Sequence, residues 1–169
     1  SVKKDRVGII PGGKIALQAQ VYTAKVDVRV DVGFGNAISP EVRKIKMPTL
    51  LDGVAPQPEV LAYPLETVIS EKVHAMAQFG ASNTRVKDYF DVWMLMKTHS
   101  FDGQELVEAV VRTFEAQERD IPSSPIEGLS EDFVDEQQGA WTAFLKRVDH
   151  KEKLSLERVV EELSVLVNP

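Results

Sequence analysis

The segment KVDVRVDV, residues 25–32, alternates charged side chains with valines. Successive side chains of a β-strand point to opposite faces, so this pattern predicts a strand with one apolar and one charged face. The preceding segment KIALQAQV, residues 14–21, alternates in the same way. Because only residues 22–24 separate the two segments, we expect them to pair as an antiparallel hairpin with one buried face.

The flanks of this hairpin are less regular. Residues 7–10 are predicted to add a third strand, joined to the hairpin through a turn at Pro11-Gly12-Gly13. Residues 33–58 contain a Gly-Phe-Gly sequence, four prolines and an Asp-Gly pair, and this composition predicts a loop.

The pattern becomes helical after Tyr63. Apolar residues in 65–79 recur with helical spacing, and a second helix is predicted to begin at Asn83 or Thr84, both suitable N-caps. Further helices are predicted after three other capping residues, Asp102, Ser130 and Ser155. We therefore predict an α+β fold, with a sheet-rich part in residues 1–62 and a helical domain in residues 63–169.

The composition of the 169 residues excludes several classes of protein. Twenty Lys and Arg against 26 Asp and Glu give a net charge of −6, which argues against a general polyanion binder, and a DNA partner is not predicted. The absence of cysteine excludes disulfides, thiolate zinc sites and cysteine nucleophiles. No apolar run approaches the ~20 residues of a membrane span, so a soluble cytoplasmic protein is expected.

Three places in the sequence can carry chemistry. Asp31 lies on the charged face of its strand, directly before Gly33-Phe34-Gly35, where a rigid carboxylate suits Mg²⁺; the alternative is a solvated strand residue. Glu71 and Lys72 follow one another on the first predicted helix, so only one of them can face a given pocket. Lys72 falls on the apolar stripe, where lysines more often snorkel than bind phosphate.

The third place is residues 85–91, at the start of the second predicted helix. Asp88 and Asp91 are three residues apart and Lys87 and Asp91 four, so each pair shares a helix face. Arg85 and Lys87 lie near the positive end of the helix, which suits a phosphate. The alternative is a surface helix with local ion pairs.

Two other patterns do not carry a site. Gly12-Gly13 with the later Asp27 and Asp31 imitates a nucleotidyltransferase signature, but that signature needs a helix after the glycines and two acids one residue apart. The three histidines are too scattered to suggest a metal cluster.

Three motifs, in order, resemble the AbiEii/AbiGii family of bacterial nucleotidyltransferase toxins: VDVGFG at 30–35, AYPLETVISEK at 62–72 and NTRVKDYFD at 83–91. Shorter segments resemble the C-terminal helical region of that family: residues 113–115, 121–122 and 141–145. The resemblance covers nearly the whole chain from about Val7. It implies transfer of a nucleotidyl group from a nucleoside triphosphate to RNA or protein with Mg²⁺, and an antitoxin partner.

The same resemblance implies roles for individual residues. Asp31 corresponds to the third metal carboxylate, and Lys72 to a lysine that touches nucleotide phosphates. Lys87 and Asp88 correspond to the late catalytic motif, in which the lysine lies near phosphate, beside Arg85, and the aspartate is a candidate base or orienting group. The predicted supporting residues are Glu71 and Asp91.

Two departures from the family pattern define the alternatives. Asn36 stands where the family usually has an aspartate, and the chain begins after the region expected to carry the glycine turn and two paired acids. With one of three metal carboxylates, we expect this chain alone to be inactive. The alternatives are a non-catalytic partner-binding module and, less favoured, a metal-dependent nuclease that uses Asp31, Asp88 and Asp91.

Overall fold

The alternating residues form the predicted antiparallel hairpin. In the computed structural model, which describes residues 2–6, 11–49, 53, 56–150 and 153–167, β2 (Pro11–Val21) pairs with β3 (Ala24–Gly33). Leu17 lies opposite Val28, so apolar residues share one face of the hairpin. β1 (Val2–Arg6) pairs with the other edge of β2 and completes a sheet of order β1-β2-β3.

The predicted turn at Pro11-Gly12-Gly13 is wrong, because these residues are the first three of β2. Gly12 and Gly13 pair with β1 on one side and with Gly33 and Val32 of β3 on the other. Pairing on both sides outweighs the local turn tendency of glycine. The third strand that was expected over residues 7–10 lies outside the described residues.

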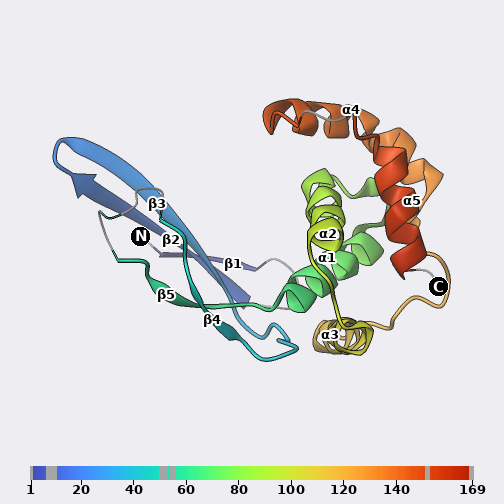
Figure 1. Cartoon of the computed structure of the whole chain (residues 1–169), viewed down its shortest axis with the longest axis horizontal. Coiled ribbons are helices and arrows are strands. Elements are labelled where there is room, and N and C mark those ends of the chain that lie inside the picture. Colours follow the sequence, from blue (N-terminus) through green and yellow to red (C-terminus); the bar gives the residue numbers. More distant parts are fainter. Residues whose placement is uncertain (1, 7–10, 50–52, 54–55, 151–152, 168–169) are drawn as a thin grey trace.

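The expected burial of one hairpin face is also wrong. Leu17 is 54% exposed and Val26, Val28 and Val30 are 39–47% exposed. Figure 1 shows the reason: the hairpin extends away from the helices, which pack against one another. The alternation therefore identified the strand correctly but not its environment.

The segment predicted to be a loop contains one strand. β4 (Arg43–Lys46) pairs antiparallel with β5 (Glu59–Ala62) in a separate two-stranded sheet. Strands end at Ala62 and helices begin at Leu65. The α+β class is confirmed, whereas the division into two domains at residues 62 and 63 stays a prediction.

In the part of the chain that the structure describes, five α-helices follow the strands: α1 (Leu65–Phe79), α2 (Val86–Thr98), α3 (Gly103–Ala116), α4 (Glu131–Arg147) and α5 (Leu156–Val167). Two 3-10 turns, η1 (Gly80–Ser82) and η2 (Glu127–Leu129), lie between them. Three predicted caps are confirmed, since the side chains of Asp102, Ser130 and Ser155 accept main-chain amide hydrogen bonds. Among the described residues, no helix combines the length and apolar character that crossing a membrane requires.

The helices enclose an aromatic core that fixes how α1 and α2 meet. Tyr89 of α2 is fully buried and stacks on Phe133 of α4, with 4.3 Å between the ring centroids. The Tyr89 hydroxyl donates to the Gly128 carbonyl at 2.8 Å. A Cβ on Gly128 would lie only 2.5 Å from the Met76 carbonyl oxygen, so η2 packs directly on the main chain of α1.

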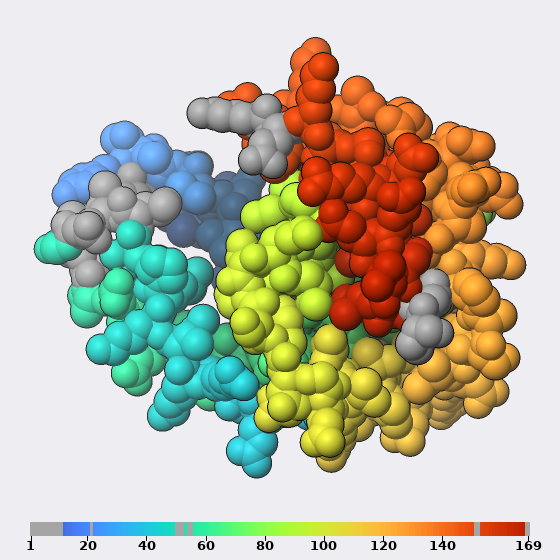
Figure 2. Space-filling model, turned by 45° about the vertical axis from the view of Figure 1, so that its right-hand side comes forward, coloured from blue at the N-terminus to red at the C-terminus, as the bar shows by residue number. Residues whose placement is uncertain are grey.

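The helix α5 braces α2 from another side, and the strands connect to α1. Figure 2 shows α5, in red, against α2, in yellow-green, where Trp93 Nε1 donates to Glu162 Oε2 at 2.8 Å.

Ser39, in the loop after β3, exchanges two buried hydrogen bonds with the Thr67 hydroxyl, at 3.0 and 2.9 Å. These bonds anchor the loop after β3 to the first turn of α1.

Candidate functional site

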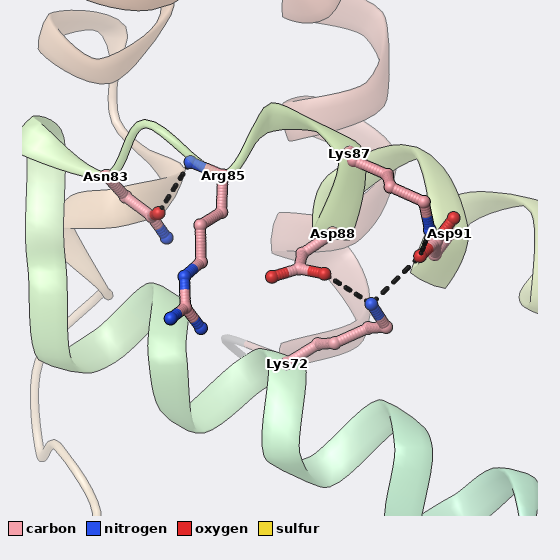
Figure 3. Close-up of polar contacts among 6 residues, drawn as sticks. All are labelled: Lys72, Asn83, Arg85, Lys87, Asp88 and Asp91. Carbon is pink, nitrogen blue, oxygen red and sulfur yellow. Dashed lines mark hydrogen bonds and ion pairs between the residues drawn. The ribbon is translucent and has the colours of Figure 1, made fainter. Parts of the chain in front are cut away.

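Lys72 of α1 lies between two aspartates of α2. Its ammonium group donates to Asp88 and, at 2.9 Å, to Asp91 (Figure 3). The three side chains are only 18–25% exposed. Asp88 and Asp91 reach the same ammonium group because residues three apart share a helix face. The predicted stripe position of Lys72 thus places its charge between the helices.

Lys87 completes a cluster of four charges, which we call the ion cluster: Lys72, Lys87, Asp88 and Asp91. Lys87 lies one turn before Asp91 on α2 and donates to it, and the Lys87 side chain is 63% exposed. Asp91 therefore accepts from both lysines, a geometry that fits the bracing role predicted for it. Two cations and two anions cancel, so an incoming phosphate competes with the carboxylates of Asp88 and Asp91 for the two lysines.

The ion cluster shifts the pKa values of Lys72 and Asp91. Burial lowers the pKa of Lys72, but hydrogen bonds and charges from Asp88 and Asp91 outweigh burial and leave the pKa raised. Burial raises the pKa of Asp91, but the two lysines outweigh it and leave the pKa lowered. The two shifts agree in cause: each partner stabilises the charged form of the other.

Asp91 should therefore stabilise the fold in a pH-dependent way. Because its pKa is lowered on folding, its contribution is fully present above the unfolded value of about 3.9 and disappears as the pH falls through the folded value. We expect Asp91→Asn to destabilise the chain at pH 7 and to have a smaller effect at pH 3, below the unfolded pKa of Asp91. Urea unfolding at both pH values measures the difference, and Asp135→Asn, on an exposed position of α4, is the control. An effect of equal size at both pH values would contradict the assignment.

Arg85 directly precedes α2. It occupies the N-cap position, but neither its own side chain nor those of Asn83 and Thr84 make the predicted cap, because the helix begins at Val86. The Arg85 side chain is exposed, and its guanidinium group lies over the Phe79 ring, 5.4 Å from the centroid. Arg85 and Lys87 thus place two exposed cations at the positive end of α2, a favourable position for an anion.

Within the described residues, Glu71 makes no hydrogen bond or ion pair with the ion cluster. As the neighbour of Lys72, it projects about 100° away around α1. Its Oε1 atom is buried and has no hydrogen-bond partner within the described part of the chain, and burial raises its pKa. The supporting role predicted for Glu71 stays a prediction.

Asp31 lies on the sheet, exposed, opposite Lys14 of β2. In the part of the chain that the structure describes, no three His, Cys, Asp or Glu side chains gather in a way that could hold a metal ion. Asp31, Asp88 and Asp91 therefore do not form a metal site, and the geometry gives the nuclease hypothesis no support. The metal-ligand role that the family resemblance implies for Asp31 stays a prediction.

Asn83 is a residue whose importance the sequence did not reveal beyond its suitability as a cap. It is 2% exposed, and its Oδ1 accepts the Arg85 main-chain amide at 3.0 Å (Figure 3). A side chain that bonds the amide two residues ahead is a common property of asparagine in turns. The sequence feature that could have indicated this bond is an asparagine two residues before Arg85.

Comparison with known proteins gives one match. A sequence model described as "Nucleotidyl transferase AbiEii toxin, Type IV TA system" matches residues 2–162. The comparison with curated proteins found no match, and neither did the comparison with solved structures. The matched range includes the strands, the ion cluster and most of α5.

Proposed function

The chain belongs to the AbiEii nucleotidyltransferase toxin family of type IV toxin–antitoxin systems, and on that premise we propose that its ion cluster handles the phosphates of a nucleoside triphosphate. The observation that supports this proposal best is Lys72, held part-buried between Asp88 and Asp91 at the start of α2. The two carboxylates orient the Lys72 ammonium group in advance, and an incoming phosphate has to compete with them for it.

The proposed reaction is nucleotidyl transfer to a hydroxyl group of RNA or protein. The acceptor oxygen forms a bond to the α-phosphorus, the bond to the bridging α–β oxygen breaks, and pyrophosphate leaves. Asp88 is the proposed base that takes the hydroxyl proton or orients the acceptor. Lys72 and Lys87 balance the negative charge of the phosphates as point charges, and Arg85 adds a planar group of donors.

Binding of a triphosphate must rearrange the ion cluster. A phosphate oxygen that takes the Lys72 ammonium group releases Asp88 from its ion pair. The released carboxylate can then accept a hydrogen bond from the hydroxyl group of the acceptor. In this proposal, substrate binding itself prepares Asp88, while Asp91 keeps Lys87 in place.

The family implies a divalent metal and an antitoxin as partners. Asp31 is the proposed metal ligand of this chain, but the described residues do not complete a metal site by themselves. The acceptor, RNA or protein, and the surface that meets the antitoxin belong to the proposal.

Triphosphate binding provides the direct test. We expect the 169-residue chain to bind nucleoside triphosphates weakly, and Lys72→Met to weaken binding about ten- to hundredfold, because it removes one charge-assisted contact. Isothermal titration calorimetry with each of the four triphosphates measures the Kd.

Lys97→Met is the matched control. Lys97 is also on α2 and also ion-paired, with Glu162 at 2.8 Å, but it lies at the other end of the helix from Arg85. Equal binding by the wild type and Lys72→Met would refute the phosphate role. Absence of binding by the wild type would favour the partner-binding module.

A further inference from the structure

The side chain of Asn83 bonds both helices that build the ion cluster. Its Oδ1 accepts from the Arg85 amide, and its Nδ2 lies 3.5 Å from both the Ala75 carbonyl of α1 and the Tyr89 hydroxyl of α2. The amide orientation follows from its partners, because a main-chain N–H only donates and a carbonyl only accepts.

The bonded atoms lie one helical turn from the Lys72–Asp88 pair. Ala75 follows Lys72 by three residues on α1, and Arg85 precedes Asp88 by three residues at the start of α2. The amide of Asp88 donates to the Arg85 carbonyl at 2.9 Å, so the position of Arg85 carries over to Asp88. Asn83 thus bonds main-chain atoms one turn from Lys72 on α1 and one turn from Asp88 at the start of α2.

The remaining contacts of Asn83 extend the network to η2. The Tyr89 hydroxyl accepts from Asn83 and donates to the Gly128 carbonyl, which forms a directed chain from Asn83 to η2. Asn83 and Tyr89 are 2% and 0% exposed. Water has little access to substitute for a lost bond here, so loss of the Asn83 side chain leaves buried polar groups unpaired.

We propose that Asn83 is a positioning residue for nucleotide handling: it holds the start of α2 against α1 so that Lys72 meets Asp88. It does this without contacting the substrate. The expected effect on nucleotide binding rests on the proposed function. The effect on the Lys72–Asp88 contact does not, and it can be tested separately.

The experiment compares three variants with a control of similar burial. Asn83→Ala removes all three contacts. Asn83→Asp keeps an oxygen that can accept from the Arg85 amide, but it places a carboxylate oxygen instead of the N–H donor next to the Ala75 carbonyl and the Tyr89 hydroxyl. Asn83→Ser keeps an acceptor on a shorter side chain and is the conservative variant. Gln137→Ala is the control, because Gln137 is a buried amide, 8% exposed, whose Nε2 lies 3.5 Å from the Ala81 carbonyl in η1.

Two readouts are measured on the full chain: the NMR signal of the Lys72 ammonium group, identified by its absence in Lys72→Met, and the Kd for ATP. We expect Asn83→Ala and Asn83→Asp to shift or broaden the ammonium signal and to raise the Kd about tenfold, the loss of roughly one good contact. Asn83→Ser should restore part of both, and Gln137→Ala should change neither even at an equal loss of Tm.

An unchanged ammonium signal in Asn83→Ala, or an equal change in Gln137→Ala, would overturn the positioning role. If Asn83→Ala does not fold, the comparison of Asn83→Asp with Asn83→Ser decides by the same criteria. If the wild type binds no ATP but the ammonium signal still depends on Asn83, the proposed function fails and the positioning role stands.

Discussion

Replacing Asp88 by asparagine should reduce nucleotidyl transfer about 10²–10⁴-fold, the usual contribution of a positioned acid or base. Asparagine is nearly isosteric and still accepts a hydrogen bond from Lys72, so the fold should be preserved. It cannot take a proton, and it removes one negative charge beside the phosphates. We therefore expect kcat to fall while KM for the triphosphate stays constant or decreases.

The assay requires a protein in which this chain is joined to the family's glycine turn and paired acids. Label transfer from each of the four triphosphates to total RNA and to protein is measured for wild type and variants, together with Tm. Asp91→Asn should lose less activity because Asp91 accepts from the two lysines and is not the proposed base, and Asp135→Asn, exposed on α4, should lose none. Transfer by Asp88→Asn at the wild-type rate would remove Asp88 from the mechanism, and robust transfer by the 169-residue chain itself would contradict its expected inactivity.

Gly128→Ala should destabilise the chain by about 3 kcal/mol or more, from overpacking together with a lost buried hydrogen bond. The added Cβ would lie 2.5 Å from the Met76 carbonyl oxygen and 2.9 Å from the Tyr89 hydroxyl oxygen. The first of these atoms is main chain of α1 and cannot rotate away. Relief requires η2 to move off α1, which breaks the bond from Tyr89 to the Gly128 carbonyl.

Gly139→Ala is the matched control for this substitution. Gly139 is exposed within α4, and a Cβ there would have no neighbour within 4 Å. Alanine should stabilise that helix by up to about 1 kcal/mol. Urea unfolding measures both variants, and a Gly128→Ala protein as stable as the wild type would show that η2 does not need the close approach.

The helices were predictable because their signals are local. Capping residues such as Asp102 and Ser130 precede apolar residues with helical spacing, and both features act within one or two turns. Gly12 and Gly13 misled because their conformation depends on two partner strands that are distant in the sequence. Burial of the hairpin failed for a similar reason: alternation describes a strand, not what covers it.

In the candidate site too, contacts within one helix could be predicted from the sequence, whereas contacts between helices could not. The pairing of Lys87 with Asp91 follows from spacing on one helix and could be predicted from residues 85–91 alone. The contact of Lys72 with Asp88 depends on how α1 packs on α2, so only the family resemblance suggested that the two residues act together. No pattern showed that the buried amide of Asn83 would bond both helices, since such a role depends on three dimensions.

The exposed hairpin also affects how the stability of the chain responds to temperature. The heat-capacity change of unfolding comes mainly from apolar surface that becomes hydrated. Leu17, Val26, Val28 and Val30 are already 39–54% exposed in the folded chain, so melting the hairpin adds less to that change than melting the buried core does. The curvature of the unfolding free energy against temperature is therefore set by the helices, and it is shallower than a fully packed chain of 169 residues would show.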